Sequence, residues 1–434
     1  MVMGPGSGMN VLLIAIDTLR SDALSCYGNP RPTSPNLDRL AAGGTLFENF
    51  YSVGNCTHPG FTAMLSGMYP ESTGVVSHWT GVDPPEDLPM MAEIFRKAGY
   101  ETAAIDNLYD GWRPRYPLYP WFRRGYSHYG YPPGEGHYRQ GSEVSRMGCR
   151  WILEEAREPF FLFMHYWDPH APYNKAPAEF YRFYDGPDPC DPRLDRMPPR
   201  IREFQRRTFG MPVTDPEYVV AAYHAETAYV DSCIGGVLGQ LESTGLADQT
   251  IVAVTSDHGD IMPNPRMALG RPWEFCHIGL NEDCLRLPLI LRGPGIEAGG
   301  RIGSRYQLVD LLPSLLEAAG VGIPGGLDGT SFAGALRGNI NDGRTELFFS
   351  ENTYQKQRAV LMWPWKYMRM EAEYLSMPPR GLYNLEMDPG EVENLADLEG
   401  DVLASMDATL DDYVSGTSRD GVDPIGAQDI TARA

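Results

Sequence analysis

The stretch that decides the fold is Asn10-Val-Leu-Leu-Ile-Ala-Ile-Asp17, an apolar run that ends abruptly in an acid. A second stretch, Ile251-Val-Ala-Val-Thr-Ser-Asp257-His258, has the same form. Short apolar runs of this kind predict buried strands, and open parallel sheets bind their ligands beyond the carboxyl ends of the strands. We therefore expect Asp17, Asp257 and His258 to meet in one crevice as ligands of a metal ion. The alternative is that Asp17 caps the next helix and that His258 bonds to a carbonyl at an ordinary strand exit.

Strand-like and helix-like patterns alternate along most of the chain. Helical patterns cover residues 35–44, 88–99 and 218–241, and strand-like runs cover 102–105 and 160–167. This alternation predicts an α/β fold with a doubly wound core, in which helices lie on both faces of the sheet.

Composition limits the class of protein and its partners. With 434 residues, of which 42% are hydrophobic and 21% charged, the chain can bury a large core. A net charge of −21 repels phosphate polymers and anionic lipids, so we expect no nucleic acid and no membrane as partner. Seven scattered cysteines without a Cys-x-x-Cys pair indicate free buried thiols. The apolar run 11–16 is too short for a signal peptide or a membrane span, and we expect a cytoplasmic protein.

Two long stretches, residues 109–141 and 184–213, break the alternation because they are rich in Pro, Arg and aromatic or acidic residues. Long loops inside compact domains usually form functional lids or interface arms. Arginines among aromatic side chains suit contact with an anionic substrate. In the first stretch these are Arg113, Arg115, Arg123 and Arg124. The alternative is that the arm packs on a sister subunit, and we expect a homo-oligomer.

Several short motifs follow one another along the chain. They are Leu65-Ser-Gly-Met-Tyr-Pro70, Asp168-Pro-His170-Ala-Pro172, Ser256-Asp257-His258-Gly259, Arg286-Leu-Pro288 and Leu382-Tyr-Asn-Leu385. Together with Ile16-Asp17-Thr18, they resemble the sulfatase branch of the alkaline phosphatase superfamily over nearly the whole chain. The resemblance implies an alkaline phosphatase-like fold: a mixed, mostly parallel sheet flanked by helices, with a smaller carboxyl-terminal α+β subdomain. We expect the catalytic domain at residues 1–335, the subdomain at 336–413 and a polar tail at 414–434.

The resemblance also implies a nucleophile. Sulfatases of this type convert the cysteine or serine of a Cys-x-Pro-x-Arg motif into formylglycine. Cys56 does not fit, because the residues after it are Thr57-His58-Pro59-Gly60-Phe61, without proline or arginine at the required offsets. Counting back from Leu65-Ser-Gly67 instead places Thr57 in the nucleophile register, with Pro59 two residues later. We expect Thr57 to be the nucleophile and a metal ligand beside Asp17, Asp257 and His258. Taken alone, a threonine in a loop can also be a turn or cap residue.

A plain threonine changes the expected chemistry. A formylglycine hydrate expels sulfate by collapsing to the aldehyde, whereas a covalent threonine intermediate must be cleaved in line by a second nucleophile. A divalent metal that depresses the hydroxyl pKa and neutralises phosphoryl charge suits that route. We expect a metal-dependent hydrolase of phosphodiesters or phosphonate monoesters first, and a sulfuric ester hydrolase of the arylsulfatase kind second. A phosphoryl-group transferase and a non-catalytic binding protein are further alternatives.

Further residues are expected around the ester. His170 aligns with a family histidine that contacts the transferred group, and His277 stands where the family often has a lysine that assists the leaving group. A histidine keeps acid–base function there. Asn107 and Tyr109 replace a lysine and a histidine, so the pocket is less cationic and favours an ester with one negative charge. His78 falls where related phosphonate monoester hydrolases have a polar pocket residue. For His78 and His277, the alternative is a surface or structural imidazole.

The expected partners are therefore a small anionic ester and a divalent ion. Oxygen-rich ligation with one imidazole suits Mn²⁺, Mg²⁺ or Ca²⁺, with Zn²⁺ as a further candidate.

Overall fold

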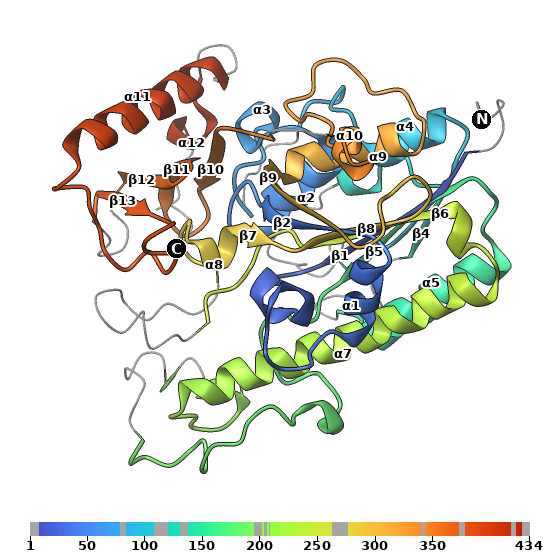
Figure 1. The fold of residues 1–434 in the computed structure, drawn as a ribbon, viewed down its shortest axis with the longest axis horizontal. Coiled ribbons are helices and arrows are strands. Elements are labelled where there is room, and N and C mark those ends of the chain that lie inside the picture. Colours follow the sequence, from blue (N-terminus) through green and yellow to red (C-terminus); the bar gives the residue numbers. More distant parts are fainter. Residues whose placement is uncertain are drawn as a thin grey trace.

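The computed structural model describes residues 8–78, 84–107, 120–130, 138–194, 202–203, 206–207, 209–262, 277–339, 343–372, 378–417 and 422–427. Within these residues a nine-stranded sheet runs through the centre of the larger domain (Figure 1), in the order β4-β3-β5-β1-β6-β8-β2-β7, with β9 paired to β2. The strands are β1 (Asn10–Ile16), β2 (Thr45–Tyr51), β3 (Glu101–Ile105), β4 (His128–Gly130), β5 (Phe160–Tyr166), β6 (Thr250–Thr255), β7 (Arg286–Leu287), β8 (Leu289–Arg292) and β9 (Gly300–Gln307).

The sheet is mixed but mostly parallel. All neighbours from β4 to β6 run parallel, and so do β2 and β9. Strand β8 is antiparallel to β6, and β7 is antiparallel to β2. This arrangement confirms the expected α/β fold with its mixed, mostly parallel sheet.

Strand β1 lies in the middle of the sheet and is buried on both faces. Leu12, Ile14 and Ile16 pack into one apolar core, and Val11 and Leu13 pack into the other. Helices cover each face (Figure 1): α1 (Pro35–Ala42), α5 (Gly141–Glu154) and α7 (Pro216–Ser243) on one side, and α2 (Thr57–Ser66), α4 (Met91–Lys97) and α9 (Leu311–Ala318) on the other. Burial on both faces explains why the run is continuously apolar rather than alternating.

The helices begin and end close to where the sequence predicts. Helix α7 begins two residues before the expected position, after Asp215, whose side chain accepts a hydrogen bond from the backbone N–H of Glu217. Helix α4 is shorter than the expected range 88–99. Its start is delayed because Pro89 disfavours a helical conformation at Leu88. The shorter helices are α3 (Pro70–Thr73), α8 (Glu282–Leu285) and α10 (Ala333–Leu336).

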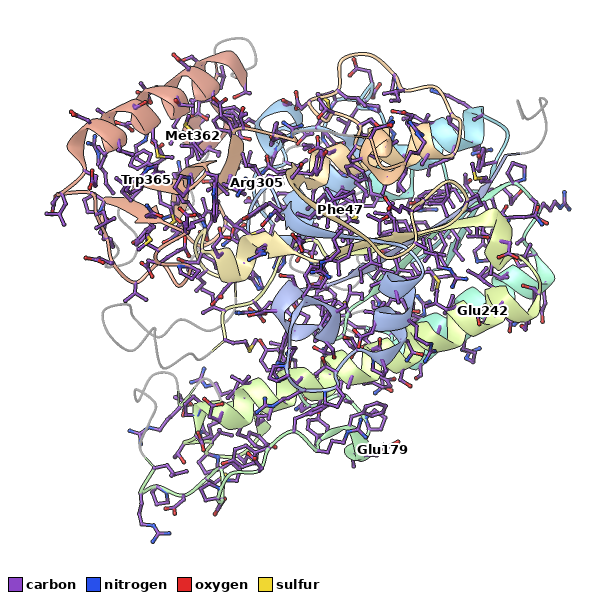
Figure 2. All side chains as sticks on the ribbon, in the orientation of Figure 1. Phe47, Glu179, Glu242, Arg305, Met362 and Trp365 are labelled. Carbon is purple, nitrogen blue, oxygen red and sulfur yellow. The ribbon has the colours of Figure 1, made fainter. Side chains whose placement is uncertain are left out.

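The carboxyl-terminal part forms a second, antiparallel sheet. It consists of β10 (Leu347–Glu351), β11 (Lys356–Met362), β12 (Trp365–Ala372) and β13 (Arg380–Asn384). Helix α11 (Gly400–Thr417) packs on it through Leu403, Met406 and Leu410. Figure 2 shows Met362 and Trp365 in this subdomain, well away from Phe47 in the core of the larger domain. The expected α+β subdomain is thus present. Helix α11 continues past residue 413, where we expected the tail, and α12 (Pro424–Ala427) buries Ile425.

A buried cation joins the two parts. Lys366 of β12 is fully buried, and its Nζ lies 3.0 Å from Glu282 Oε1 of α8 and 2.9 Å from Glu391 Oε1. Removing one partner of such a buried pair leaves an uncompensated charge, so this contact fixes the small sheet relative to the region around α8.

Two expectations about the loops and cysteines need correction. The guanidinium of Arg124 forms an ion pair with Glu93 of α4 at 2.7 Å. This arginine therefore has a structural partner and does not fit the expected role in binding an anionic substrate. Arg113 and Arg115 lie outside the described residues. The six described cysteines are free, as expected, but four of them are only half-buried. Among the described residues, no helix is both long enough and apolar enough to cross a membrane.

Candidate metal centre and active site

The two acid-bearing strands are direct neighbours. Strands β1 and β6 are parallel, with Ala15 beside Thr255, so the residues that follow them emerge at the same edge of the sheet. Asp17, Asp257 and His258 each offer a ligand atom there, and these atoms lie within 4.8 Å of one another. All three side chains are fully buried. The structure thus brings together the three residues that the sequence placed in one crevice.

The cluster has the properties of a cation site. Both carboxylate oxygens of Asp17 and Oδ2 of Asp257 are buried without a hydrogen-bond partner. Burial and the neighbouring Asp257 raise the pKa of Asp17 to about 6, although His165 and His258 act in the opposite direction. Leaving such oxygens buried and unmatched is costly, and a divalent cation would compensate them. Hard carboxylate oxygens with one imidazole fit such an ion.

The backbone after β1 is strained at the same place. Thr18 has a φ of 56°, which is rare for a β-branched residue. In this conformation its N–H donates to Oδ1 of Asp257 at 3.2 Å. Local strain of this kind persists where the surrounding structure enforces it, and it often marks a functional site.

Thr57 is the first residue of α2, and its side chain reaches the cluster. Its Oγ1 lies 3.2 Å from Nε2 of His258, whose Nδ1 lies 2.8 Å from the carbonyl oxygen of Gly259. Donation from Nδ1–H to that carbonyl leaves the Nε2 lone pair facing the hydroxyl and the acids. Cys56 precedes the helix, with its buried Sγ 3.5 Å from Asn55 Oδ1, and burial raises the pKa of its thiol. Thr57, rather than Cys56, therefore contacts His258.

His258 belongs to a cluster of five neighbouring imidazole rings. The His277 ring centroid lies 4.4 Å from that of His258, 5.6 Å from that of His170 and 6.3 Å from that of His78. The His58 ring lies 4.8 Å from the His78 ring. Burial lowers the pKa of His58 to about 3 and also lowers the pKa values of His78 and His170. These three rings are therefore neutral near pH 7.

His277 has a polar partner on each ring nitrogen. Nδ1 lies 3.7 Å from Oδ1 of Asp260, and Nε2 lies 3.3 Å from the Tyr354 hydroxyl. Asp260 in turn accepts a hydrogen bond from Tyr173. Tyr354 comes from the connection between β10 and β11, so the carboxyl-terminal subdomain contributes to the site.

Asn107 has a different environment from the one expected. Its Nδ2 donates to the carbonyl oxygen of His165 at 3.2 Å, and its Oδ1 accepts the backbone N–H of Arg139 at 3.0 Å. A fully buried amide engaged by backbone at both ends suits a structural role, because substrate contact would have to compete with those bonds. Tyr109, its predicted companion, lies outside the described residues.

Three residues around the site were not anticipated. His58 follows Thr57 directly and could have been inferred from helical geometry. His165 stands at the carboxyl end of the buried strand β5, and Nδ1 and Nε2 lie 3.0 Å from Asp106 Oδ1 and 3.5 Å from Asp17 Oδ2. Its signal was a polar residue at a strand end, the same signal that identified Asp17. Tyr354 is distant in sequence and had no local signal.

Comparison with known proteins places these features in a family. Delta 4,5-hexuronate-2-O-sulfatase of Bacteroides thetaiotaomicron is 25% identical, over 95% of this chain and 90% of that protein. Choline-sulfatase of Rhizobium meliloti is 25% identical, over 89% of this chain and 82% of that protein. The phosphonate monoester hydrolase structure of Agrobacterium radiobacter superposes with a TM-score of 0.76 at 20% identity, over 94% of this chain and 96% of that one, and supports the fold alone.

Two family descriptions cover almost all of the chain. N-sulphoglucosamine sulphohydrolase, C-terminal, matches residues 275–415. The description Sulfatase matches residues 9–321, which include all the residues of the acidic cluster and Thr57. Because this match spans well over half of the chain, the protein belongs to the sulfatase family and is a hydrolase of ester bonds.

Proposed function

We propose that this protein hydrolyses a sulfate monoester, with Thr57 as the nucleophile. The sequence alone ranked phosphodiesters and phosphonate monoesters first. Three relatives favour the opposite order, because the delta 4,5-hexuronate-2-O-sulfatase, the choline-sulfatase and the arylsulfatase of Clostridium perfringens, each at 25% identity, are all sulfatases.

One observation carries the proposal. The Thr57 hydroxyl stands 3.2 Å from His258 Nε2, beside the buried carboxylates of Asp17 and Asp257. A hydroxyl is a weak nucleophile at its free pKa and needs a neighbouring group to activate it. In this site, His258 and the carboxylates that would hold a cation lie next to the Thr57 hydroxyl and can activate it.

The low positive charge of the pocket favours a substrate ester with one negative charge. His58, His78 and His170 have lowered pKa values, so they add little positive charge to the pocket near pH 7. The resemblance to the family aligns Asn107 with a lysine, so this position supplies no cation. A sulfate monoester carries one negative charge, whereas a phosphate monoester carries close to two at this pH. The smaller charge needs less compensation.

The residues divide the reaction between them. A divalent cation held by Asp17, Asp257 and His258 would withdraw charge from the sulfuryl oxygens and lower the pKa of the Thr57 hydroxyl. The Thr57 hydroxyl gives its proton to solvent as Oγ1 attacks sulfur, the bond from sulfur to the leaving alcohol oxygen breaks, and His277 gives that oxygen a proton. Water then attacks sulfur, the bond to Thr57 Oγ1 breaks and bisulfate leaves. Thr57 recovers its proton, and His277 is reprotonated from solvent.

The donor set also narrows the choice of ion. Asp17 and Asp257 supply hard oxygens, and His258 supplies a single nitrogen. This ligand set suits Ca²⁺, Mg²⁺ or Mn²⁺ better than Zn²⁺, which is often held by thiolates.

A panel of aryl esters tests the proposal. Metal-stripped protein re-supplied with Ca²⁺, Mg²⁺ or Mn²⁺ is assayed on 4-nitrophenyl sulfate, bis(4-nitrophenyl) phosphate, 4-nitrophenyl phenylphosphonate and 4-nitrophenyl phosphate. We expect the sulfate to give the highest kcat/KM and the phosphate monoester the lowest. A phosphate monoester turned over faster than the sulfate would contradict the charge argument.

Phosphonate monoester hydrolysis is the second candidate, and the identity of residue 57 favours it. A threonine cannot be converted to formylglycine as cysteine or serine can, and phosphoryl centres tolerate a covalent alkoxide intermediate well. A higher kcat/KM on the phosphonate or diester than on the sulfate would support this candidate. Product formation that requires added glycerol would instead indicate a transferase.

A further inference from the structure

A row of side chains crosses the carboxyl edge of the sheet behind Asp17. It begins at Tyr129 of β4, whose hydroxyl donates to Oδ2 of Asp106, the residue after β3. Oδ1 of Asp106 lies 3.0 Å from Nδ1 of His165 on β5. Nε2 of His165 lies 3.5 Å from Oδ2 of Asp17, the residue after β1. Because β4, β3, β5 and β1 are consecutive in the sheet, each strand contributes one member of the row.

We propose that Tyr129, Asp106 and His165 form a positioning support for Asp17, which sets the affinity of the protein for its divalent cation. The inference rests on the metal site of the proposed function, but it does not depend on which ester is hydrolysed.

The flanking groups define what His165 does. Each of its ring nitrogens faces a carboxylate oxygen, and an ionised carboxylate only accepts hydrogen bonds. Nδ1 lies within hydrogen-bond distance of Asp106, whereas Nε2 lies against Asp17 at ion-pair distance, so the ring fills the gap between the two acids. The ring is fully buried, and Asp106 is itself held by the Tyr129 hydroxyl. The position of His165 against Asp17 is therefore fixed by its neighbours.

Fixing Asp17 has a direct consequence for the cation. A carboxylate with both oxygens otherwise unmatched could rotate or take up a proton, and either change would weaken its binding of the ion. Partners behind a metal ligand orient it, and their removal typically costs about 10- to 100-fold in metal affinity. His165 and Asp106 have this position relative to Asp17.

Calorimetric titration of Mn²⁺ into metal-stripped protein tests the support. We expect His165→Gln, which can reach only one of the two acids, to raise the Kd by about 10- to 100-fold. Asp106→Asn should raise it less, and Tyr129→Phe by a few-fold. His224→Gln is the matched control, because His224 bonds to Asn29 and Arg31 away from Asp17 and should leave the Kd unchanged.

The outcomes separate this inference from the proposed function. A Kd within twofold of wild type in His165→Gln and Asp106→Asn, or a wild type that binds no Mn²⁺, overturns the support. If His165→Gln does not fold, Asp106→Asn and Tyr129→Phe decide the question. A graded loss of affinity in a protein that hydrolyses no ester supports the inference and rejects the proposed function.

Discussion

The covalent route depends on Thr57, the first residue of α2, because its hydroxyl contacts Nε2 of His258. We expect Thr57→Ala to lower kcat by several orders of magnitude, since it removes the nucleophile while the acids remain. Thr57→Ser should keep measurable turnover, because the hydroxyl is retained. Steady-state rates on the best aryl ester measure both, with a melting curve to show that each variant folds. Near-wild-type rates in Thr57→Ala would point to direct attack by water.

Cys56 is the neighbour that a formylglycine mechanism would use. Its Sγ points to Asn55 rather than His258, so we expect Cys56→Ala to keep most of the activity. Intact-mass analysis of the purified protein should find Cys56 unmodified. A loss of about 18 mass units at Cys56, the difference between a thiol and an aldehyde, would restore formylglycine chemistry and remove Thr57 from its role.

Site residues could be predicted from the sequence where a rule links their position to strand geometry. Asp17, Asp257 and His258 follow from apolar runs that end in polar residues, and the β1–β6 pairing brings them together. The same rule applies to His165, but a single histidine inside the Phe-rich run of β5 does not interrupt the apolar pattern and gives only a weak signal. The family resemblance predicts substrate contact for Asn107, whereas its actual hydrogen bonds depend on the tertiary position of Arg139, which the sequence does not report.

At the scale of elements, the β10–β11 connection extends the site. The backbone N–H of Ser350, near the end of β10, donates to the carbonyl oxygen of Val53, in the segment that leads to Thr57. Thr353 accepts the backbone N–H of His78, and Tyr354 contacts His277. The sequence predicted the small sheet but not this contact, because a connection between strands has no periodicity that reports its long-range neighbours.

Removing the Tyr354 hydroxyl tests that contact. A neutral hydrogen bond contributes about 0.5–1.5 kcal/mol, so Tyr354→Phe should lower kcat/KM by about two- to thirteenfold. The loss should grow as the leaving alcohol becomes less acidic, because His277 then matters more. Tyr367→Phe removes a hydroxyl from β12 that bonds Asp407 at 2.8 Å, and it should leave this dependence unchanged. Equal losses for all leaving groups in Tyr354→Phe would contradict a role through His277.

At the scale of the whole molecule, buried neutral histidines make stability depend on pH. Burial and the nearby Arg31 lower the pKa of His224 to about 4, from an ordinary 6.5. As pH falls from about 6.5 to 4, the unfolded chain takes up a proton that folded His224 does not, so folding stability declines. We expect His224→Gln to reduce this decline, measured as urea-unfolding free energy at pH 7, 5.5 and 4.5. An identical slope in variant and wild type would show that His224 is already protonated in the folded state.

Binding of the divalent cation should stabilise the entire larger domain, because its ligands come from the central strands β1 and β6. An ion that binds only the folded state adds about 2.7 kcal/mol at 100 times its Kd, which raises the melting temperature.

A chain with net charge −21 also attracts divalent ions weakly over its surface, so the comparison needs two variants. Asp257→Asn keeps the shape of the side chain but removes a ligand charge, and it should abolish the rise. Glu179→Gln changes an exposed acid far from the central sheet (Figure 2) and should retain the full rise. If both variants respond to Mn²⁺ as wild type does, the stabilising ion is bound elsewhere and the cluster of Asp17, Asp257 and His258 is not the metal centre.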